Sequence, residues 1–381
     1  METKMKILIT GGAGFIGTRL TRDLLLTGHE ITILDDFLPQ VHGGRTALAP
    51  DIAASVRLVT GNVANVSALR DALAGIECVV HLAAETGTGQ SMYEVVRYER
   101  ANLGGSAALY EILANTPRLK VQKIVVASSR AIYGEGAYRC DRDGVVYPAS
   151  RSSKEKQLGM FDPVCPLCGG ACSTIPTPET APLQPTSYYG LTKQVQEQTA
   201  LLFGRALEIP TFALRYQNVY GPGQSLHNPY TGILAIFSNL ARTSRKIRIF
   251  EDGAESRDFV HVGDVVRATK ACITTSAGGC HSFNVGSSER TTVLDVAKQV
   301  NAYFGGLSEV EITGAFREGD IRHGMADLTL IRKVIGYEPQ CGFAEGLRTF
   351  LDWATGHTPE AAGYERSLAE MRDRGLLHPR R

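Results

Sequence analysis

The sequence predicts an α/β fold, in which a doubly wound parallel sheet is followed by a smaller C-terminal α/β lobe. Two observations predict it. In the first half of the chain, short runs rich in β-branched residues alternate with amphipathic helical runs. These short runs are also apolar almost throughout, as strands are when helices cover both faces of a parallel sheet.

Six strands are expected in the first part of the chain, with helices between most of them. The expected strands are 6–10, 30–34, 56–59, 78–83, 123–127 and 211–214. The expected helices are 15–26, 66–74, 102–115 and 188–207. Right-handed connections between such elements place the strands side by side in one sheet.

The composition excludes several classes of protein. The chain has 381 residues, enough for two domains. Its 40 Lys and Arg balance 39 Asp and Glu, so no excess of charge favours nucleic acid or an anionic membrane. No apolar run reaches the ~20 residues of a membrane span, and the first residues lead directly into a strand rather than a signal peptide. We expect a cytoplasmic protein with no nucleic-acid or membrane partner.

A glycine-rich turn follows the first expected strand and opens the first expected helix. Gly11 allows the tight turn, Gly14 lets backbone N–H groups approach a pyrophosphate, and Gly17 lets helix and strand pack closely. Asp35 ends the next strand, where a carboxylate accepts hydrogen bonds from ribose hydroxyls and repels a 2′-phosphate. The turn therefore predicts a Rossmann site for NAD rather than NADP.

The chain is expected to divide near residue 215. Residues 1–215 would form the NAD-binding Rossmann domain, and 216–356 mainly a substrate-binding lobe, with some segments returning to the first domain. Residues 357–381 are predicted to be a charged C-terminal tail with a surface helix at 364–374. The segment 135–182 is too long for an ordinary loop, so we expect an insertion with its own local organisation. In the second half we expect strands at 247–250 and 283–285, and helices at 262–273, 293–304 and 343–354.

A tyrosine and a lysine share one face at the start of an expected helix. Tyr189 and Lys193 are four residues apart, and a nearby ammonium would lower the pKa of the phenol from its usual value near ~10. Tyr189 could then act as a general base near neutral pH, while Lys193 binds the nicotinamide ribose. Ser129 follows strand 123–127, at the carboxyl edge where α/β sheets bind ligands.

These residues together resemble the extended short-chain dehydrogenase/reductase family, which contains the nucleotide-sugar epimerases and dehydratases. The resemblance extends over about residues 5–355. Its motifs are Asn102 and the segments 11–17, 81–84, 127–129, 189–193, 214–222, 257–262 and 317–320.

The resemblance implies roles for individual residues. Ser129, Tyr189 and Lys193 would be the catalytic residues. With the glycine-rich turn, it implies a cofactor site formed by Gly11, Gly14, Phe15, Ile16, Gly17, Asp35, Asp36, Asn62, Val63, Leu82, Ala83, Ala84, Asn102, Tyr189, Lys193 and Tyr216. The substrate residues would be Thr86, Ser129, Arg130, Asn218, Arg257, Arg317 and Asp320. Two arginines suit a diphosphate, because a guanidinium binds phosphate oxygens in pairs.

One departure narrows the implied reaction. Sugar 4,6-dehydratases carry Asp-Glu after the catalytic hydroxyl, where this chain has Arg130 and Ala131. An arginine, whose pKa stays above ~12, cannot serve as a general acid. The resemblance therefore implies an NAD-dependent isomerase that oxidises C4 of a nucleotide-diphosphate hexose to a 4-keto sugar and returns the hydride to the opposite face. It also implies a homodimer, built from the helices at 102–115 and 188–207.

Two other functions remain open from the sequence. A reductase of nucleotide-diphosphate 4-keto-deoxysugars would exchange its dinucleotide in each turnover and usually takes NADPH, which Asp35 opposes. A non-catalytic NAD-binding protein would keep the fold without the chemistry. The intact Ser129, Tyr189 and Lys193 argue against this second alternative.

The insertion holds four of the chain's eight cysteines. Cys165 and Cys168 have the two-residue spacing of a metal knuckle, Cys172 follows closely, and Cys140 would supply a fourth thiolate. A second Cys-x-x-Cys pair is missing, so free thiols are the competing interpretation. A structural zinc ion without catalytic role is the hypothesis that the spacing favours.

Overall fold

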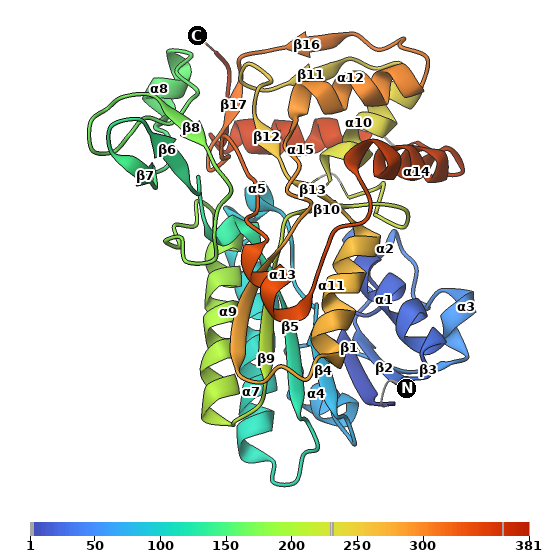
Figure 1. The fold of residues 1–381 in the computed structure, drawn as a ribbon. Helices are drawn as coiled ribbons and strands as arrows, with labels where there is room; N and C mark the ends of the chain where they lie inside the picture. The colour runs from blue at the N-terminus through green and yellow to red at the C-terminus, as the bar shows by residue number, and fades with distance from the viewer. Residues whose placement is uncertain (1–3, 229, 231, 360–361, 381) are drawn as a thin grey trace.

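The computed structural model describes residues 4–228, 230, 232–359 and 362–380, and its centre is a seven-stranded parallel sheet (Figure 1). The strands lie in the order β14-β9-β5-β4-β1-β2-β3. They are β1 (Lys6–Thr10), β2 (Glu30–Asp35), β3 (Val56–Thr60), β4 (Cys78–His81), β5 (Lys123–Ser129), β9 (Thr211–Tyr216) and β14 (Cys280–Val285). The winding direction reverses between β1 and β4, which is where doubly wound sheets bind ligands. The predicted fold class is confirmed.

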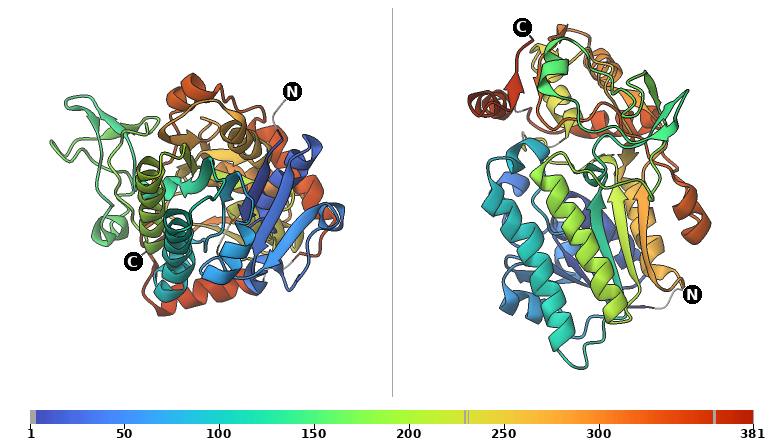
Figure 2. Two further views of the ribbon diagram at one scale, coloured as in Figure 1. Left: turned by 90° about the horizontal axis from the view of Figure 1, so that it is seen from below. Right: turned by 90° about the vertical axis from the view of Figure 1, so that its left-hand side faces the viewer.

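Helices cover both faces of this sheet (Figure 2). One face packs against α1 (Phe15–Leu26) and α11 (Val262–Thr274). The other face packs against α4 (Val66–Ala72), α7 (Gly105–Asn115) and α9 (Tyr188–Ala206). In β1, Ile7 and Ile9 contribute to the first core and Leu8 to the second. Because successive side chains of a strand point to opposite faces, both sets must be apolar.

Two elements of the second half return to the sheet of the first domain. The expected strand at 283–285 is the end of β14, which pairs with β9 at the edge of the main sheet. The expected helix at 262–273 is α11, which packs against α1. The expected helix at 102–115 begins as a π-helical turn, η1 (Glu99–Gly104), before α7.

The C-terminal lobe has a separate core above the sheet. It is formed by α10 (Ile233–Arg242), α12 (Val293–Tyr303), α14 (Phe343–Thr355) and the strand pair β11 (Ile247–Ile249) and β16 (Val310–Ile312). Two further strand pairs connect it to the sheet: β10 (Asn218–Tyr220) with β13 (Phe259–His261), and β12 (Ser256–Arg257) with β15 (Thr291–Thr292). Further short helices in the described residues are α2 (Pro39–His42), α3 (Pro50–Ala53), α5 (Thr88–Ser91), α6 (Val95–Tyr98), η2 (Arg130–Ile132) and α13 (Thr329–Ile335).

The segment predicted to be a charged tail packs onto this lobe. The expected helix is α15 (Ala362–Asp373), and its Leu368 and Met371 are buried. After it, β18 (Leu377–His378) pairs antiparallel with β17 (Phe316–Arg317). Residues 360, 361 and 381 of the predicted tail, like 1–3 of the predicted first domain, lie outside the described residues. Of the helices in the described ranges, none has the length and apolar character of a membrane span.

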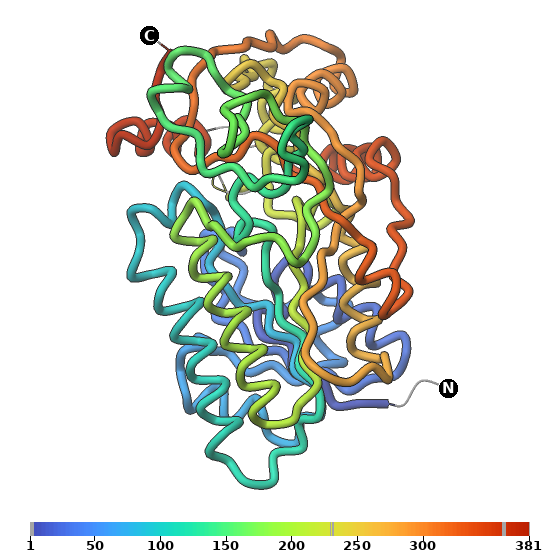
Figure 3. Tube along the Cα trace, turned by 60° about the vertical axis from the view of Figure 1, so that its left-hand side comes forward, coloured from blue at the N-terminus to red at the C-terminus, as the bar shows by residue number. Residues whose placement is uncertain are grey.

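The insertion forms a small antiparallel sheet of its own. Its strands are β6 (Tyr138–Cys140), β7 (Gly144–Val146) and β8 (Cys172–Thr174), in the order β7-β6-β8, and α8 (Ser153–Gln157) lies in the connection. Figure 3 shows this green segment at the end of the molecule that carries the C-terminal lobe.

Candidate active site

A pocket of about 570 Å³ lies at the carboxyl ends of the central strands. Its sheet side is lined by the β1–α1 turn and the ends of β2, β4 and β5, and its lobe side by residues of β10, β12, β17 and α15. The volume is typical of a site for small molecules and cofactors. Every predicted cofactor and substrate residue except Asn102 lines it.

The glycine-rich turn leaves space for an anionic ligand. Gly14 is the N-cap of α1 and makes no side-chain capping bond, so the first N–H groups of the helix remain available. A Cβ atom on Gly17 would lie 2.6 Å from Cα of Gly12, so a larger residue would displace the turn. A helix N-terminus with a compact turn fits the pyrophosphate of a dinucleotide.

Two adjacent carboxylates end β2 at the pocket. Asp35 is buried, and its carboxylate accepts hydrogen bonds from the backbone N–H groups of Ala13 at 3.0 Å and Phe37 at 2.9 Å. Asp36 is exposed and accepts a hydrogen bond from Nδ2 of Asn62 at 2.7 Å. Asp35 therefore holds the glycine-rich turn in place as well as facing the pocket, and both charges would repel a 2′-phosphate.

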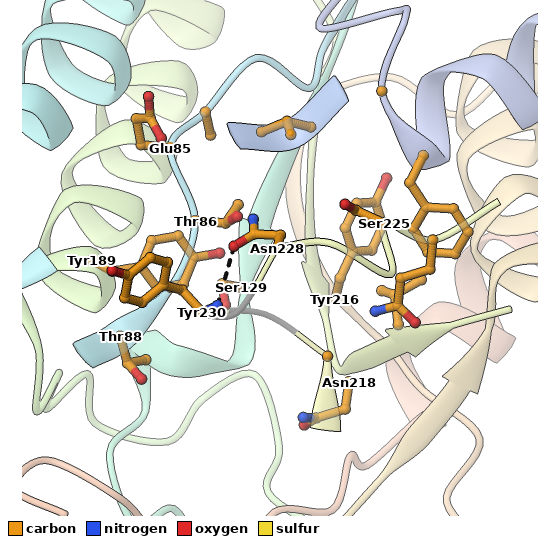
Figure 4. Close-up of a pocket in the computed structure, with 18 of the residues that line it drawn as sticks. Glu85, Thr86, Thr88, Ser129, Tyr189, Tyr216, Asn218, Ser225, Asn228 and Tyr230 are labelled. Atoms are coloured by element: carbon orange, nitrogen blue, oxygen red, sulfur yellow. Dashed lines mark hydrogen bonds between the residues drawn. The ribbon is translucent and has the colours of Figure 1, made fainter. Parts of the chain in front are cut away.

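Ser129 and Tyr189 meet in one part of the pocket, together with Thr86 and Tyr230 (Figure 4). Ser129 is the last residue of β5, and Tyr189 lies in the first turn of α9. Burial raises the pKa of the Tyr189 phenol, whereas its hydrogen bond with Ser129 and the positive charge of Arg130 both lower it. The pocket thus places a cation and a hydroxyl beside the phenol.

Lys193 does not have the electrostatic role that the sequence predicted for it. Its ammonium is buried and donates a hydrogen bond to Oε1 of Gln196. Burial lowers the pKa of Lys193 to about 7, against the raising effect of Glu197, because the charged form loses its hydration. The sequence predicted that Lys193 lowers the pKa of Tyr189, but here that effect comes from Ser129 and Arg130.

Three cationic side chains line the pocket: Arg257 and Arg317 on its lobe side, and Arg130 directly after β5. Arg257 is held by the carbonyl groups of Ser256 at 2.9 Å and Ile321 at 3.0 Å. Arg317 donates to Oδ2 of Asp320 at 2.7 Å. Burial lowers the pKa of Arg130 to about 10, and the charge of Arg257 adds to this effect, so Arg130 stays protonated at neutral pH. The three positive charges favour an anionic ligand.

Asn218 also lines this cationic part of the pocket. Its Oδ1 atom is buried and has no hydrogen-bond partner within the described part of the chain. Buried polar atoms are nearly always paired, so this amide is suited to a ligand. The arrangement supports the predicted substrate side of the pocket.

Asn102 does not lie at the pocket surface, although the sequence places it among the cofactor residues. It is fully buried in η1. Its Oδ1 accepts from the backbone N–H of Glu85 at 2.8 Å, and its Nδ2 donates to Oγ1 of Thr192 at 2.9 Å. Asn102 thus joins the segment after β4 to α9, behind the pocket wall.

Some pocket residues, from the C-terminal segment and one lobe loop, were not predicted from the sequence. Tyr364 and Met371 of α15 line the pocket, as do Asn228 and Tyr230. The Tyr230 hydroxyl donates to Oε2 of Glu370 at 2.7 Å, which ties the loop to α15. No motif marks these residues. Only the apolar spacing of the predicted surface helix could have indicated that one face of it is packed.

The cysteines of the insertion lie apart from the pocket, in their own small core. Sγ of Cys140 is 3.5 Å from Sγ of Cys168, and Sγ of Cys165 is 3.2 Å from Oδ2 of Asp143. The mutually close ligand atoms are those of Cys140, Asp143, Cys165 and Cys168. Cys172, the remaining predicted ligand, lies opposite Cys140 in the ladder of β6 and β8 and is not part of this group.

The chain matches the model of the NAD dependent epimerase/dehydratase family over residues 7–154 and 168–286, and it belongs to this family. Among its relatives, dTDP-L-rhamnose 4-epimerase of Burkholderia thailandensis is 37% identical over 351 residues, covering 91% of this chain and 94% of the relative. UDP-glucose 4-epimerase of Mycolicibacterium smegmatis is 30% identical over 348 residues, covering 90% of this chain and 96% of the relative.

Solved structures share the fold. UDP-glucose 4-epimerase of Thermotoga maritima, solved with UDP-glucose, has a TM-score of 0.74 at 27% identity and covers 92% of this chain and 99% of its own. The same enzyme of Thermus thermophilus, solved with NAD, has a TM-score of 0.72 at 26% identity and covers 93% of this chain and 100% of its own. The family resemblance predicted from the motifs is confirmed.

Proposed function

We propose that the protein is an NAD-dependent isomerase that inverts C4 of a nucleotide-diphosphate hexose. One observation carries the proposal: a single pocket is lined by a dinucleotide-type turn, by Ser129 with Tyr189, and by Arg257 with Arg317. Relatives named as 4-epimerases, among them those acting on dTDP-L-rhamnose and UDP-glucose, support the same reaction.

In this proposal Tyr189 removes the proton of the C4 hydroxyl and later returns it. The hydrogen bond from Ser129 and the charge of Arg130 favour the phenolate, which burial alone would disfavour. When bound, NAD supplies the hydride acceptor for C4 and, once reduced, the hydride donor. Arg257 and Arg317 hold the diphosphate, so the 4-keto sugar can turn its other face without leaving the pocket.

The residues around the turn fit NAD. Available N–H groups begin α1, no Cβ obstructs the turn, and two carboxylates end β2. Lys193 is proposed to bind the nicotinamide ribose. Since each turnover ends with the cofactor in its starting state, we expect it to stay bound during purification.

The protein is further proposed to be a cytoplasmic homodimer. The helices α7 and α9 lie side by side on one flank of the sheet (Figure 2). On α9, the side chains of Leu191, Val195 and Leu202 are exposed although apolar. A second copy of the chain packed on this flank would remove them from water.

A structural zinc ion in the insertion belongs to the same proposal. Among the described residues that line the pocket there is no cysteine, so a metal held by Cys140, Cys165, Cys168 and their neighbours would not meet the substrate.

The test is incubation with a panel of nucleotide-diphosphate hexoses, dTDP-L-rhamnose and UDP-glucose included, followed by NMR. The expected result is inversion at C4 of one substrate with no added cofactor, and NAD or NADH absorbance in the purified protein. A protein that binds NAD but inverts no sugar of the panel, or one that needs added NADPH to reduce a 4-keto sugar, contradicts the proposal.

A further inference from the structure

Two turns of the insertion repeat one pattern. In the first, Cys140 is followed after two residues by Asp143 and then by Gly144; in the second, Cys165 is followed after two residues by Cys168 and then by Gly169. Gly144 has φ of 74° and Gly169 has φ of 71°, the left-handed conformation that ends both turns. The chain therefore contains a second turn of the metal-knuckle type, with a carboxylate in place of one thiol.

The two turns bring their four ligand atoms together. One ligand atom from each of Cys140, Asp143, Cys165 and Cys168 lies within 4.8 Å of all the others. A tetrahedral zinc site with Zn–S bonds of ~2.3 Å places neighbouring sulfurs about 3.8 Å apart. The observed 3.5 Å between Sγ of Cys140 and Sγ of Cys168 is close to this value and far longer than a disulfide bond.

The backbone holds both turns in this arrangement. Cys140 pairs with Gly144 across β6 and β7, and the N–H of Gly169 donates to the carbonyl of Cys165 at 2.8 Å. Cys172 lies beside this group, where its thiol interacts with those of Cys140 and Cys165. Its Sγ lies 3.8 Å from the carbonyl oxygen of Gly170, outside the group of four.

We propose that Cys140, Asp143, Cys165 and Cys168 bind one zinc ion, and that Cys172 is not a ligand. Three thiolates favour zinc over magnesium or calcium, which prefer oxygen ligands. Four protein ligands leave no open coordination position. The metal therefore holds the two turns of the insertion together and takes no part in catalysis.

The metal site shares its small core with Tyr138, whose side chain contacts the segment that carries Arg317 and Asp320. Tyr138 and Cys140 are on the same face of β6, and both belong to the core of the insertion. The ring of Tyr138 lies 6.3 Å from the ring of His323. The metal therefore supports the surface that the insertion presents to residues 316–327.

An ion-pair network continues this contact to the pocket. Arg151 donates to Glu135 at 2.9 Å and to the carbonyl oxygen of Asp320 at 2.9 Å. Glu135 in turn accepts from the backbone N–H of Arg322 at 2.8 Å. Asp320 is the partner of Arg317. Resting on the proposed function, this arrangement makes zinc a positioning element for the diphosphate side of the substrate site.

The direct test is metal analysis of the intact protein, purified without chelator, and of single variants. We expect about one zinc per chain in the wild type, and a loss of more than about tenfold in zinc affinity in Asp143→Asn and Cys165→Ser. Cys172→Ser is the matched control and should keep its zinc. If a variant does not fold, zinc release from the wild type by a chelator, followed with a zinc-sensitive dye, still tests whether the chain binds zinc.

Two outcomes would overturn the metal site. The first is folded wild-type protein that contains only traces of zinc and takes up none when zinc is added. The second is the loss of zinc from Cys172→Ser together with its retention in Asp143→Asn, which would transfer the fourth ligand position to Cys172. Neither readout depends on enzyme activity, so both stand even if the proposed function fails.

The link to the substrate site is tested by removing the metal. In the zinc-free protein we expect KM for the nucleotide-diphosphate sugar to rise at least about tenfold, while the amount of bound NAD stays unchanged. An unchanged KM after complete removal of zinc would show that the insertion does not position the substrate side. Loss of NAD together with zinc would also contradict the link, because the metal would then support the whole fold and not the substrate side alone.

Discussion

The two sides of the pocket are built in different ways. On the sheet side, Gly14, Ser129 and Tyr189 lie at the ends of β1 and β5 and at the start of α9, where backbone geometry fixes them. On the lobe side, Arg257 depends on carbonyl groups of a distant segment, and Arg317 on Asp320, which the insertion holds. We infer that changes on the sheet side affect the cofactor and the chemistry, and that changes on the lobe side affect the substrate.

The largest expected effect is that of Tyr189→Phe. Removing the hydroxyl that takes the C4 proton should slow turnover by about 10²–10⁴-fold or more, while NAD remains bound. Turnover is measured by NMR and bound NAD by absorbance after denaturation. Tyr188→Phe, one residue away, is the control and should turn over normally. If Tyr189→Phe retains wild-type turnover, the proposed general base is wrong.

Gly17→Ala tests the cofactor turn. A Cβ atom here would lie 2.6 Å from the backbone of Gly12, so the turn must shift, at a cost of about 1–3 kcal/mol. We expect loss of bound NAD in a protein that remains folded, measured by absorbance and circular dichroism. Gly278→Ala has open space around it and should retain NAD. Full NAD content in Gly17→Ala would contradict this account of the turn.

Arg317→Lys tests the lobe side. A lysine keeps the charge but cannot bind two phosphate oxygens in the same plane, so KM should rise by about tenfold to a hundredfold with a smaller change in kcat. NAD content should be unchanged, which would separate this variant from those of the sheet side. Lys154→Arg, an exposed change in the insertion, is the control. A fall in kcat at constant KM would mean that the two sides are not independent.

The smallest expected effect concerns pH. The charge of Arg130 lowers the pKa of Tyr189, so Arg130→Met should raise that pKa and move the rising limb of kcat to higher pH. A shift of one unit makes turnover about tenfold slower below the pKa and restores it above the pKa. The kcat–pH profile is the measurement. If the limb moves in Lys193→Met but not in Arg130→Met, the cation beside Tyr189 is the lysine, as the sequence predicted.

Short sequence motifs were sufficient to predict which residues line the sheet side of the pocket. The turn from Gly11 to Gly17 and the Tyr189–Lys193 pair each lie within one segment, so their geometry follows from a strand end or a helix start. The lobe side depends on contacts between distant segments. Nothing in the sequence near Glu370 indicates that it accepts a hydrogen bond from Tyr230. Likewise, nothing near Asn102 indicates that its amide is hydrogen-bonded to Thr192 and Glu85.

The charges were also harder to predict than the positions. Tyr189 and Lys193 both lie in α9 and line the pocket. The pKa of Lys193, however, depends on its burial among Gln196 and Glu197, which only the folded structure gives. The zinc hypothesis named four cysteines from their spacing, and three of them lie together with Asp143 in the structure. The sequence did not indicate Asp143, because a carboxylate in a two-residue spacing carries no signal until the two turns meet.

The most direct test of the central claim uses a nucleotide-diphosphate hexose that carries deuterium at C4, with NMR of the product in ordinary water. Hydride removal and return within one closed pocket predicts a C4-inverted sugar that keeps its deuterium. A product inverted at C4 that carries hydrogen from water would contradict the account, because the label would then have left the pocket.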